Sequence, residues 1–350
     1  MAGSKSVKHL IRDTVYYGLF SSGLLGLVLK KMAADRREHP CIILTYHRFV
    51  DNRSMYLSKG PAMHHEIREF EKELMYLKQH YHIVSIDEAV SRIKRGLGFS
   101  RPSVVLTFDD GYLDNYTLAY PVLKRYGMPA AIYLTTGLIG TSERTWPDQI
   151  ELALLETRQD RFNHPDLFDG KPMAISSKTE KEKVCLDVGQ ALKALPDEQR
   201  RHIVKELVDS LGVNGSTERA PRVMLNWEEV REMAQDGITF GSHSFTHPIL
   251  SRMPVEKAKE EIFKSKKILE EHLGVEVKHF AFPNGGKNDF SEELREYCQE
   301  IGFESIASLI PGTNTGVTGD VFSLKRIGTM SPVWLMAGNL ARLSAKCNGG

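Results

Sequence analysis

The sequence of 350 residues predicts an α/β fold in which parallel strands close into a barrel. From residue 40 onward, strand-like apolar runs alternate with helix-like segments, and this alternation is typical of a parallel sheet. The number of these units favours a closed barrel over an open sheet. Several polar side chains also follow the ends of predicted strands, where barrels of this kind carry their functional residues.

The expected strands are short apolar runs separated by helical patterns. They begin near Ile42, Val104, Ala130, Ile238, His279, Ser305 and Phe322. The helical patterns cover residues 70–79, 87–94, 115–126 and 255–273. The last helix is the best defined, because Pro254 suits a first-turn position and Gly274 can end it. Its expected buried face carries Ala258, Ile262, Ser265, Leu269 and Leu273.

We expect residues 1–38 to form a basic and apolar N-terminal helix. Basic residues flank an apolar-leaning run of 15 residues, 15–29, with Lys5, Lys8 and Arg12 before it and Lys30 and Lys31 after it. The run is shorter than the roughly 20 residues of a spanning helix. We therefore expect a helix in peripheral contact with a membrane, with an uncleaved signal anchor and a packed terminal helix as alternatives. The protein would be membrane-associated, either on the cytoplasmic face or through a signal anchor.

Residues 39–335 are expected to form the main domain, and residues 336–350 a C-terminal tail. Within the main domain, residues 141–222 show few strand signals and many charges. This pattern predicts two or three amphipathic helices inserted into a barrel loop. Because loops at the active end of a barrel carry specificity, the insert is either a lid or binding wall, or a simple helical filler.

Composition excludes some classes of function. The 46 basic and 45 acidic residues nearly balance, so no electrostatic attraction to nucleic acid is expected. The four cysteines, Cys41, Cys185, Cys298 and Cys347, are scattered, which predicts reduced, mostly buried thiols. The sequence contains no repeat or heptad from which an oligomeric state can be predicted.

Two short runs supply ligands for a divalent metal. Asp109 and Asp110 follow an apolar run that is typical of a buried parallel strand. Both carboxylates can serve one site only if the chain turns there, and Gly111 allows such a turn. About 130 residues later, His243 and His247 follow a second strand-like piece, and a tight turn would bring both imidazoles to one ion. These side chains together indicate a metal-assisted hydrolase.

The two runs resemble the motifs of the polysaccharide deacetylase family, also called the NodB-homology domain or the fourth carbohydrate-esterase family. The matching segments are Thr-Phe-Asp-Asp-Gly-Tyr at 107–112 and Gly-Ser-His-Ser-x-Thr-His-Pro at 241–248. The resemblance covers about residues 40–330. It implies a distorted (β/α) barrel of about seven parallel strands, with the helical segment inserted.

Roles follow from this resemblance residue by residue. Asp109 would be the catalytic base, and Asp110, His243 and His247 would be the metal ligands. Zn²⁺ is expected because histidine and carboxylate suit it, while Mn²⁺, Co²⁺ and Ni²⁺ accept the same ligands. A backbone N–H near Tyr112 would stabilise the oxyanion.

A third family motif, Arg-x-Pro-x-Gly, is present only in part. Pro283 and Gly285 match it, whereas Ala281 stands where the family has the arginine that steadies the base. Pro283 and the neighbouring Asn284 are candidates for contacts with substrate or oxyanion.

The partner of the base and the catalytic acid come from other parts of the chain. Arg326 and Arg48 are both candidates for the missing arginine, with ordinary surface charges as the alternative, and the residues alone do not choose between them. Arg326 is also a candidate for contact with substrate or oxyanion. The usual C-terminal histidine of the family is absent from residues 322–328. His47 ends a strand-like run and resembles the opening Tyr-His of the poly-N-acetylglucosamine deacetylases, whose strand order is circularly permuted. It is therefore the expected acid, with a strand-capping histidine as the alternative.

The resemblance implies a metal-dependent hydrolase that removes N-acetyl groups from hexosamine residues of a polysaccharide or its lipid-linked precursor. The alternatives are a deformylase or related amide hydrolase acting on a lipid-linked amino sugar, and an inactive carbohydrate-binding barrel. The expected partner is a carbohydrate polymer or oligosaccharide, and no nucleic acid. Trp146, Trp227, Tyr112 and Tyr133 can stack on sugar rings or pack in the core, and for Trp227 we favour packing.

Overall fold

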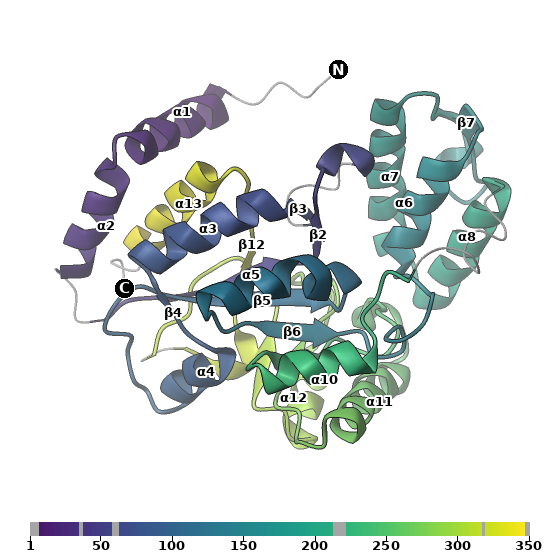
Figure 1. The fold of residues 1–350 in the computed structure, drawn as a ribbon. Coiled ribbons are helices and arrows are strands. Elements are labelled where there is room, and N and C mark those ends of the chain that lie inside the picture. Colours follow the sequence, from purple (N-terminus) through teal and green to yellow (C-terminus); the bar gives the residue numbers. More distant parts are fainter. Residues whose placement is uncertain (1–6, 35–37, 58–62, 213–221, 317–318, 347–350) are drawn as a thin grey trace.

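Seven parallel strands form a nearly closed barrel in this computed structural model, in the order β11-β10-β9-β6-β5-β1-β12 (Figure 1). The structure describes residues 7–34, 38–57, 63–212, 222–316 and 319–346. The barrel strands are β1 (Cys41–Tyr46), β5 (Ser103–Asp110), β6 (Ala131–Leu134), β9 (Thr239–Ser242), β10 (His279–Ala281), β11 (Ser305–Ala307) and β12 (Arg326–Gly328). The predicted α/β barrel of about seven parallel strands is thereby confirmed.

The gap between the two end strands is bridged by backbone contacts. Ala307 of β11 forms a parallel bridge with Leu324, just before β12. The N–H of Ser308 also donates to the carbonyl of Leu324 at 2.9 Å. A short strand, β4 (His82–Ile83), pairs with the start of β5. Two further pairs lie outside the barrel: β2 (Arg48–Val50) with β3 (His64–Glu66), and β7 (Arg161–Phe162) with β8 (Met173–Ala174).

Successive residues of the barrel strands face two different apolar clusters. On β5, Val104, Leu106 and Phe108 join the large cluster formed with the surrounding helices. Val105 instead joins a second cluster that also contains Ile43 of β1 and residues of three other barrel strands. This period of two is the geometry of a strand buried on both faces. The side chains of Thr107 and Asp109, two and four residues after Val105, are therefore expected on the inside of the barrel.

Helices surround the strands and mostly match the predicted patterns. Those packed around the barrel are α3 (Ile67–His80), α4 (Ile86–Lys94), α5 (Tyr120–Tyr126), α10 (Trp227–Gln235), α11 (Val255–Leu273) and α12 (Glu292–Glu300). The first part of the helix expected at 115–126 is a π-helical turn, Asn115–Ala119. Three-residue 3₁₀ turns occur at Arg53–Met55, Phe168–Gly170, Leu250–Arg252 and Val321–Ser323.

The last barrel strand begins later than expected. The sequence predicted its start near Phe322, but this residue lies in the 3₁₀ turn and β12 starts at Arg326. The carboxylate of Asp320 accepts from the N–H of Phe322 at 2.8 Å and so stabilises the turn.

The described part of the segment from 141 to 222 stands beside the barrel as a small helical unit, called the insert below (Figure 1). It contains α6 (Trp146–Glu156), α7 (Lys178–Lys193), α8 (Asp197–Ser210) and the β7–β8 pair. These elements share their own apolar cluster, which includes Val188, Leu192 and Leu207, and Leu57 from the barrel side also joins it. The insert is therefore held together by a core separate from the barrel core.

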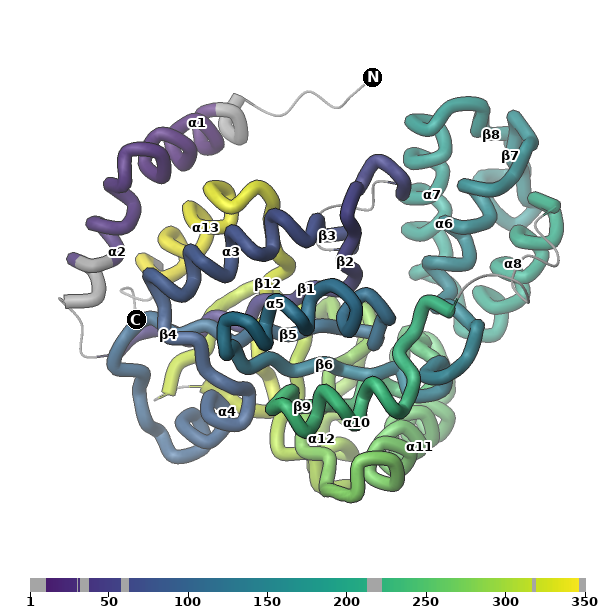
Figure 2. The backbone as a smooth tube through the Cα atoms, in the orientation of Figure 1, coloured from purple at the N-terminus to yellow at the C-terminus, as the bar shows by residue number. Residues whose placement is uncertain are grey.

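The two ends of the described chain pack together against α3, on the side of the barrel away from the insert (Figure 2). The expected N-terminal helix is a pair, α1 (Val7–Ser21) and α2 (Leu24–Ala34). Most of the expected tail is helical and belongs to α13 (Val333–Lys346). This helix packs against α1 and α2. Of the residues named above, Lys5 and Cys347 lie outside the described ranges. Within those ranges, no helix is both long and apolar enough to cross a membrane.

Leu192 and Leu186 of α7 make a matched pair for testing the core of the insert. Leu192 is fully buried, whereas Leu186 is 52% exposed. We expect Leu192→Ala to lower the free energy of unfolding by about 2–5 kcal/mol, because it leaves a cavity. Leu186→Ala should change it by less than about 0.5 kcal/mol. Urea unfolding measures both, and equal effects would contradict the separate core.

Candidate active site

Asp109 and Asp110 end β5, and both are buried. Neighbouring strand residues point to opposite faces, so one of the two must leave strand geometry if they are to share a site. Asp110 does so with a φ of +75°, and Gly111 continues the turn with a φ of +86°. A Cβ on Gly111 would lie 2.5 Å from the side chain of Leu134. The turn therefore requires glycine and brings both carboxylates to one end of the barrel.

His243 and His247 reach the same place from the end of β9. Nδ1 of His243 lies 2.7 Å from the carbonyl oxygen of Ala281. Because a carbonyl only accepts, Nδ1 carries the proton and Nε2 is left as a ligand atom. His247 has a φ of +63°, and its N–H donates to Oγ of Ser244 at 3.1 Å. This turn places the two imidazole rings 5.1 Å apart.

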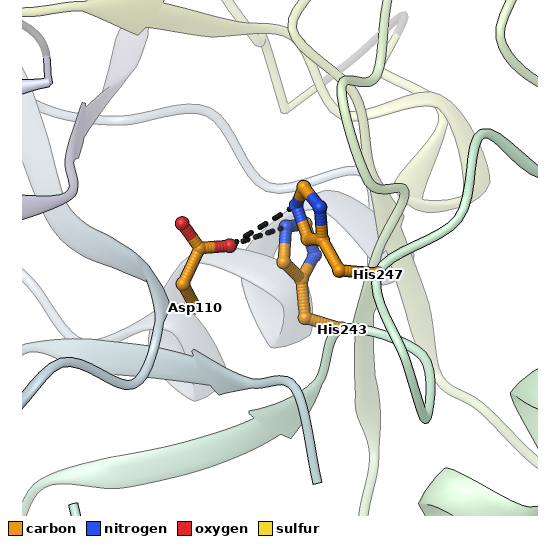
Figure 3. Close-up of side chains that lie close together, drawn as sticks. All are labelled: Asp110, His243 and His247. Carbon is orange, nitrogen blue, oxygen red and sulfur yellow. Dashed lines mark ion pairs between the residues drawn. The ribbon is translucent and has the colours of Figure 1, made fainter. Parts of the chain in front are cut away.

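Asp110, His243 and His247 meet at the mouth of the barrel (Figure 3). Oδ1 of Asp110 lies 3.1 Å from Nε2 of His247 and 3.5 Å from Nε2 of His243. One ligand atom from each residue lies within 4.8 Å of the other two. A carboxylate oxygen and the lone pair of a neutral imidazole repel each other when buried without a cation between them. The three residues therefore fit a divalent metal, for which their chemistry is suited.

The carboxylate of Asp109 is clamped by Arg326 from β12. Nη1 lies 2.6 Å from Oδ1 and Nη2 lies 2.9 Å from Oδ2, so the pair is bidentate. The guanidinium is fully buried, and its Nε donates to the carbonyl of Ser308 at 3.1 Å. The ring of Tyr133 lies 5.2 Å from it on another side. These contacts fix the orientation of Asp109 before any substrate binds.

This geometry distinguishes the two arginines that the sequence left open. Arg48 pairs with Asp114 at 3.1 Å and lies over the ring of Tyr112, 4.9 Å from its centroid. Ala281, where the family has its arginine, is buried and uses its carbonyl to bind His243. Arg326 therefore supplies the cationic partner of the base from a different strand.

The charges of the site lower the pKa values of both carboxylates. Burial alone raises the pKa of Asp109, but the charge of Arg326 outweighs this effect, and the net pKa is below the ordinary value. Burial likewise raises the pKa of Asp110, and His247 is the main group that reverses the direction. Desolvation lowers the pKa of His243 to about 4. At neutral pH both carboxylates are thus ionised and His243 is neutral, as metal ligation and proton abstraction require.

His47 lies at the end of β1, next to these groups. Its Nε2 is 4.0 Å from Oδ2 of Asp109, and its side chain is 14% exposed. The side-chain amide of Asn115 donates to the carbonyl of His47 at 2.7 Å, which fixes the backbone there. His47 can therefore reach a substrate that Asp109 also contacts.

These residues line a cavity of about 330 Å³ between the barrel and the insert. The barrel side carries His47, Asp109, Asp110, His243, His247 and Asn284. The opposite wall comes from the insert and includes Trp146, Pro147, Ile150, Leu186, Gln190 and Lys193. Of the residues in that wall, only Trp146 was predicted from the sequence as a possible contact with a sugar ring. Leu186, Gln190 and Lys193 are spaced by four and three residues on α7, and this helical spacing could have indicated that they share one face.

The remaining candidates lie around the cavity and do not line it. Tyr112 is buried beneath Arg48, while its backbone is held by hydrogen bonds on both sides, from Leu113 to Val223 and from Leu225 to Gly111. Tyr133 packs under Arg326, and Trp227 stacks on His272 with the ring centroids 3.8 Å apart. Pro283 is not among the residues that line the cavity.

Comparison with known proteins agrees with this geometry. The profile of the family described as "Polysaccharide deacetylase" matches residues 97–306. YxkH of Bacillus subtilis (strain 168) is 22% identical over 286 residues, which are 81% of this chain and 70% of that protein. The poly-beta-1,6-N-acetyl-D-glucosamine N-deacetylase of Staphylococcus aureus is 30% identical over 113 residues, 30% of this chain and 39% of that enzyme.

A solved structure shows the same fold over most of the chain. The Streptococcus pyogenes deacetylase PplD, in complex with acetate, matches with a TM-score of 0.57 at 18% sequence identity. The match covers 88% of this chain and 99% of PplD. The family profile spans more than half of the sequence and contains both carboxylates and both histidines of the site. The chain therefore belongs to the polysaccharide deacetylase family, whose members are hydrolases.

Proposed function

We propose that this protein is a metal-dependent hydrolase that removes N-acetyl groups from hexosamine residues of a polysaccharide. The observation that carries the proposal is the clamped carboxylate of Asp109 beside the set of Asp110, His243 and His247. The similarity to the S. aureus N-deacetylase supports an N-acetylglucosamine polymer as the substrate class.

Each residue has a distinct task in this reaction. A divalent metal held by Asp110, His243 and His247 would polarise the acetamide carbonyl and activate water. Asp109, ionised and oriented by Arg326, accepts a proton from the attacking water. A backbone N–H near Tyr112 would donate a hydrogen bond to the oxyanion, because the turn at Gly111 holds that backbone at the mouth of the barrel.

His47 completes the reaction as the acid. The departing amine is a poor leaving group unless it gains a proton as the bond breaks. His47 stands 4.0 Å from the carboxylate of the base, close enough for both to act on one substrate. For the metal we propose Zn²⁺, with Mn²⁺, Co²⁺ and Ni²⁺ as the other ions that this ligand set accepts.

Substituting Asp109 and Asp110 one at a time tests the roles proposed for the two carboxylates. We expect Asp110→Ala to abolish both metal binding and the release of amine from N-acetylglucosamine oligomers. Asp109→Asn should retain the metal but lower kcat by about 10²–10⁴-fold, since it removes only the base. Metal content by elemental analysis and amine release by a fluorogenic amine reagent measure the two properties separately.

Controls for this test cover folding, metal and acyl group. Circular dichroism checks that each variant is folded, and a chelator followed by Zn²⁺ should remove and restore the activity of the unmodified protein. N-formylated oligomers, assayed in parallel, identify a deformylase if they react faster than acetylated ones. Full activity in the presence of chelator, or a folded, metal-loaded protein that releases no amine from either substrate, contradicts the proposal.

Arg326 provides a second test, based on its buried pair with Asp109. Arg326→Met leaves the carboxylate buried and unpaired, so we expect the free energy of unfolding to fall by about 3–5 kcal/mol. The double variant Asp109→Asn/Arg326→Met should recover part of this loss, because no uncompensated charge remains. Urea unfolding of the single and double variants measures the difference, and additive losses would show that the pair is not coupled.

We also propose that the pair α1 and α2 contacts the surface of a lipid bilayer. Six of its apolar side chains are 45–61% exposed: Ile11, Val15, Tyr17, Leu24, Leu27 and Val28. Among residues 1–34 the only acidic residue is Asp13, and its carboxylate is bound by Arg12 at 2.7 Å. An apolar surface with an excess of basic residues suits an interface that contains anionic lipids.

Leu27 and Val275 allow this surface to be tested with a matched control. Both are exposed, by 61% and 62%, but Val275 lies after α11, outside the N-terminal pair. We expect Leu27→Glu to weaken sedimentation with phosphatidylserine-containing vesicles by about tenfold or more, because one apolar side chain no longer enters the interface. Val275→Glu should have no effect, and equal behaviour of the two variants counts against membrane contact. Truncation is less suitable, since Leu25 and Leu29 belong to the barrel core cluster.

A further inference from the structure

Helix α7 has one face in the core of the insert and another that lines the cavity. Val184, Val188 and Leu192 are buried in the core of the insert. The other face carries Leu186, Gly189, Gln190 and Lys193, spaced by three, four and seven residues from the first. All four line the cavity that holds the metal-ligand set and Asp109, and we call them the α7 stripe.

The α7 stripe differs from the solvent face of an ordinary helix. Leu186 is an exposed leucine at 52%, although it stands inside the cavity of the site. Gly189 lies within the helix, where glycine is unfavourable relative to alanine. Outside its own helix and chain neighbours, no atom lies within 4 Å of the position that a Cβ would take at Gly189. Local packing therefore does not require this glycine, and its effect is to leave the cavity wide.

The chemistry of the stripe suits a sugar. A pyranose ring has an apolar C–H face and a rim of hydroxyls. Leu186 offers an apolar contact, while Gln190 and Lys193 are exposed and offer donors. The indole of Trp146 and the side chain of Ile150 extend the apolar wall beside them. A cavity of about 330 Å³ is also far larger than an acetyl group requires and matches the lower range of sites for whole ligands.

We propose that the α7 stripe is a saccharide-binding subsite, which holds a sugar unit next to the one that loses its acetyl group. The inference rests on the proposed deacetylase function and adds a preference for oligomers over single sugars. Contacts to a neighbouring unit position the reacting unit over Asp109 and the ligand set, so remote binding energy contributes to the rate. Because Gly189 has no side chain, the saccharide has room to lie along the helix.

The test compares a substrate that reaches the stripe with one that does not. N-acetylglucosamine oligomers extend across the cavity, whereas 4-nitrophenyl acetate presents only an acetyl group to the site. We expect Gly189→Leu and Leu186→Ala each to lower kcat/KM for the oligomer about tenfold more than kcat/KM for the ester. Lys193→Gln should raise KM for the oligomer more than it lowers kcat.

Lys183 of the same helix gives the matched control. It is exposed, forms an i,i+4 pair with Asp187, and does not line the cavity. Lys183→Gln removes the same charge as Lys193→Gln and should leave the ratio of oligomer to ester activity as it is in the unmodified protein. Thermal unfolding of every variant identifies any that fails to fold, and the remaining stripe variants then decide the question.

Each outcome bears on the subsite. A selective loss for the oligomer supports it. Equal losses for oligomer and ester, or no loss for either, overturn it, because the stripe then acts on the whole site or only faces solvent. If the unmodified, metal-loaded protein deacetylates neither substrate, the proposed function itself fails, and the subsite with it. Ester activity without any oligomer activity in the unmodified protein overturns the subsite and leaves an acetyl hydrolase.

Discussion

The site depends on one backbone constraint, the left-handed turn at Asp110 and Gly111. Strand geometry would direct Asp109 to the inside of the barrel and Asp110 to the helices outside. Two consecutive residues with positive φ cancel this alternation, so that the carboxylates of Asp109 and Asp110 lie at the same end of the barrel. A similar device operates at the end of β9, where positive φ values at Ser244 and His247 bring the second imidazole back to the first. The cluster of Asp110, His243 and His247 thus depends on an unfavourable backbone conformation at these few positions.

The pairing of β12 with β1 positions the guanidinium that holds Asp109. Strand β1 lies between β12 and β5, so Arg326 must reach across it to hold Asp109. This is possible only because the last strand of the chain pairs with the first. The carboxylate is then ionised within the protein interior, since a bidentate guanidinium outweighs the effect of burial on its pKa. The orientation of Asp109 is in this way a property of the whole fold, because it depends on a residue more than 200 positions away in the sequence.

These two features explain what the sequence could predict. Strand positions and the four motif side chains follow from local patterns, namely apolar runs, a glycine after two aspartates and two histidines four residues apart. The partner of Asp109 did not follow, because the sequence around Arg326 or Arg48 does not show which of them lies beside Asp109, and only the strand order does. The start of β12 was displaced because the side chain of Asp320 stabilises a turn at Phe322. The α7 stripe was missed because its residues are individually ordinary, and only the packing of the insert reveals which face of the helix meets the cavity.

The positions of the insert and of the N-terminal pair connect the two proposed surfaces. Helices α1 and α2 lie on one side of the barrel, and helix α7 lies on the other (Figure 2). A bilayer in the proposed contact with α1 and α2 would therefore leave the cavity open to the aqueous phase. A long polysaccharide can then enter along α7 without passing through the lipid interface, whereas a sugar attached directly to a membrane lipid would have to cross the width of the barrel. With the proposed membrane contact, this arrangement would favour a polymer whose reacting unit lies several sugars away from any lipid anchor.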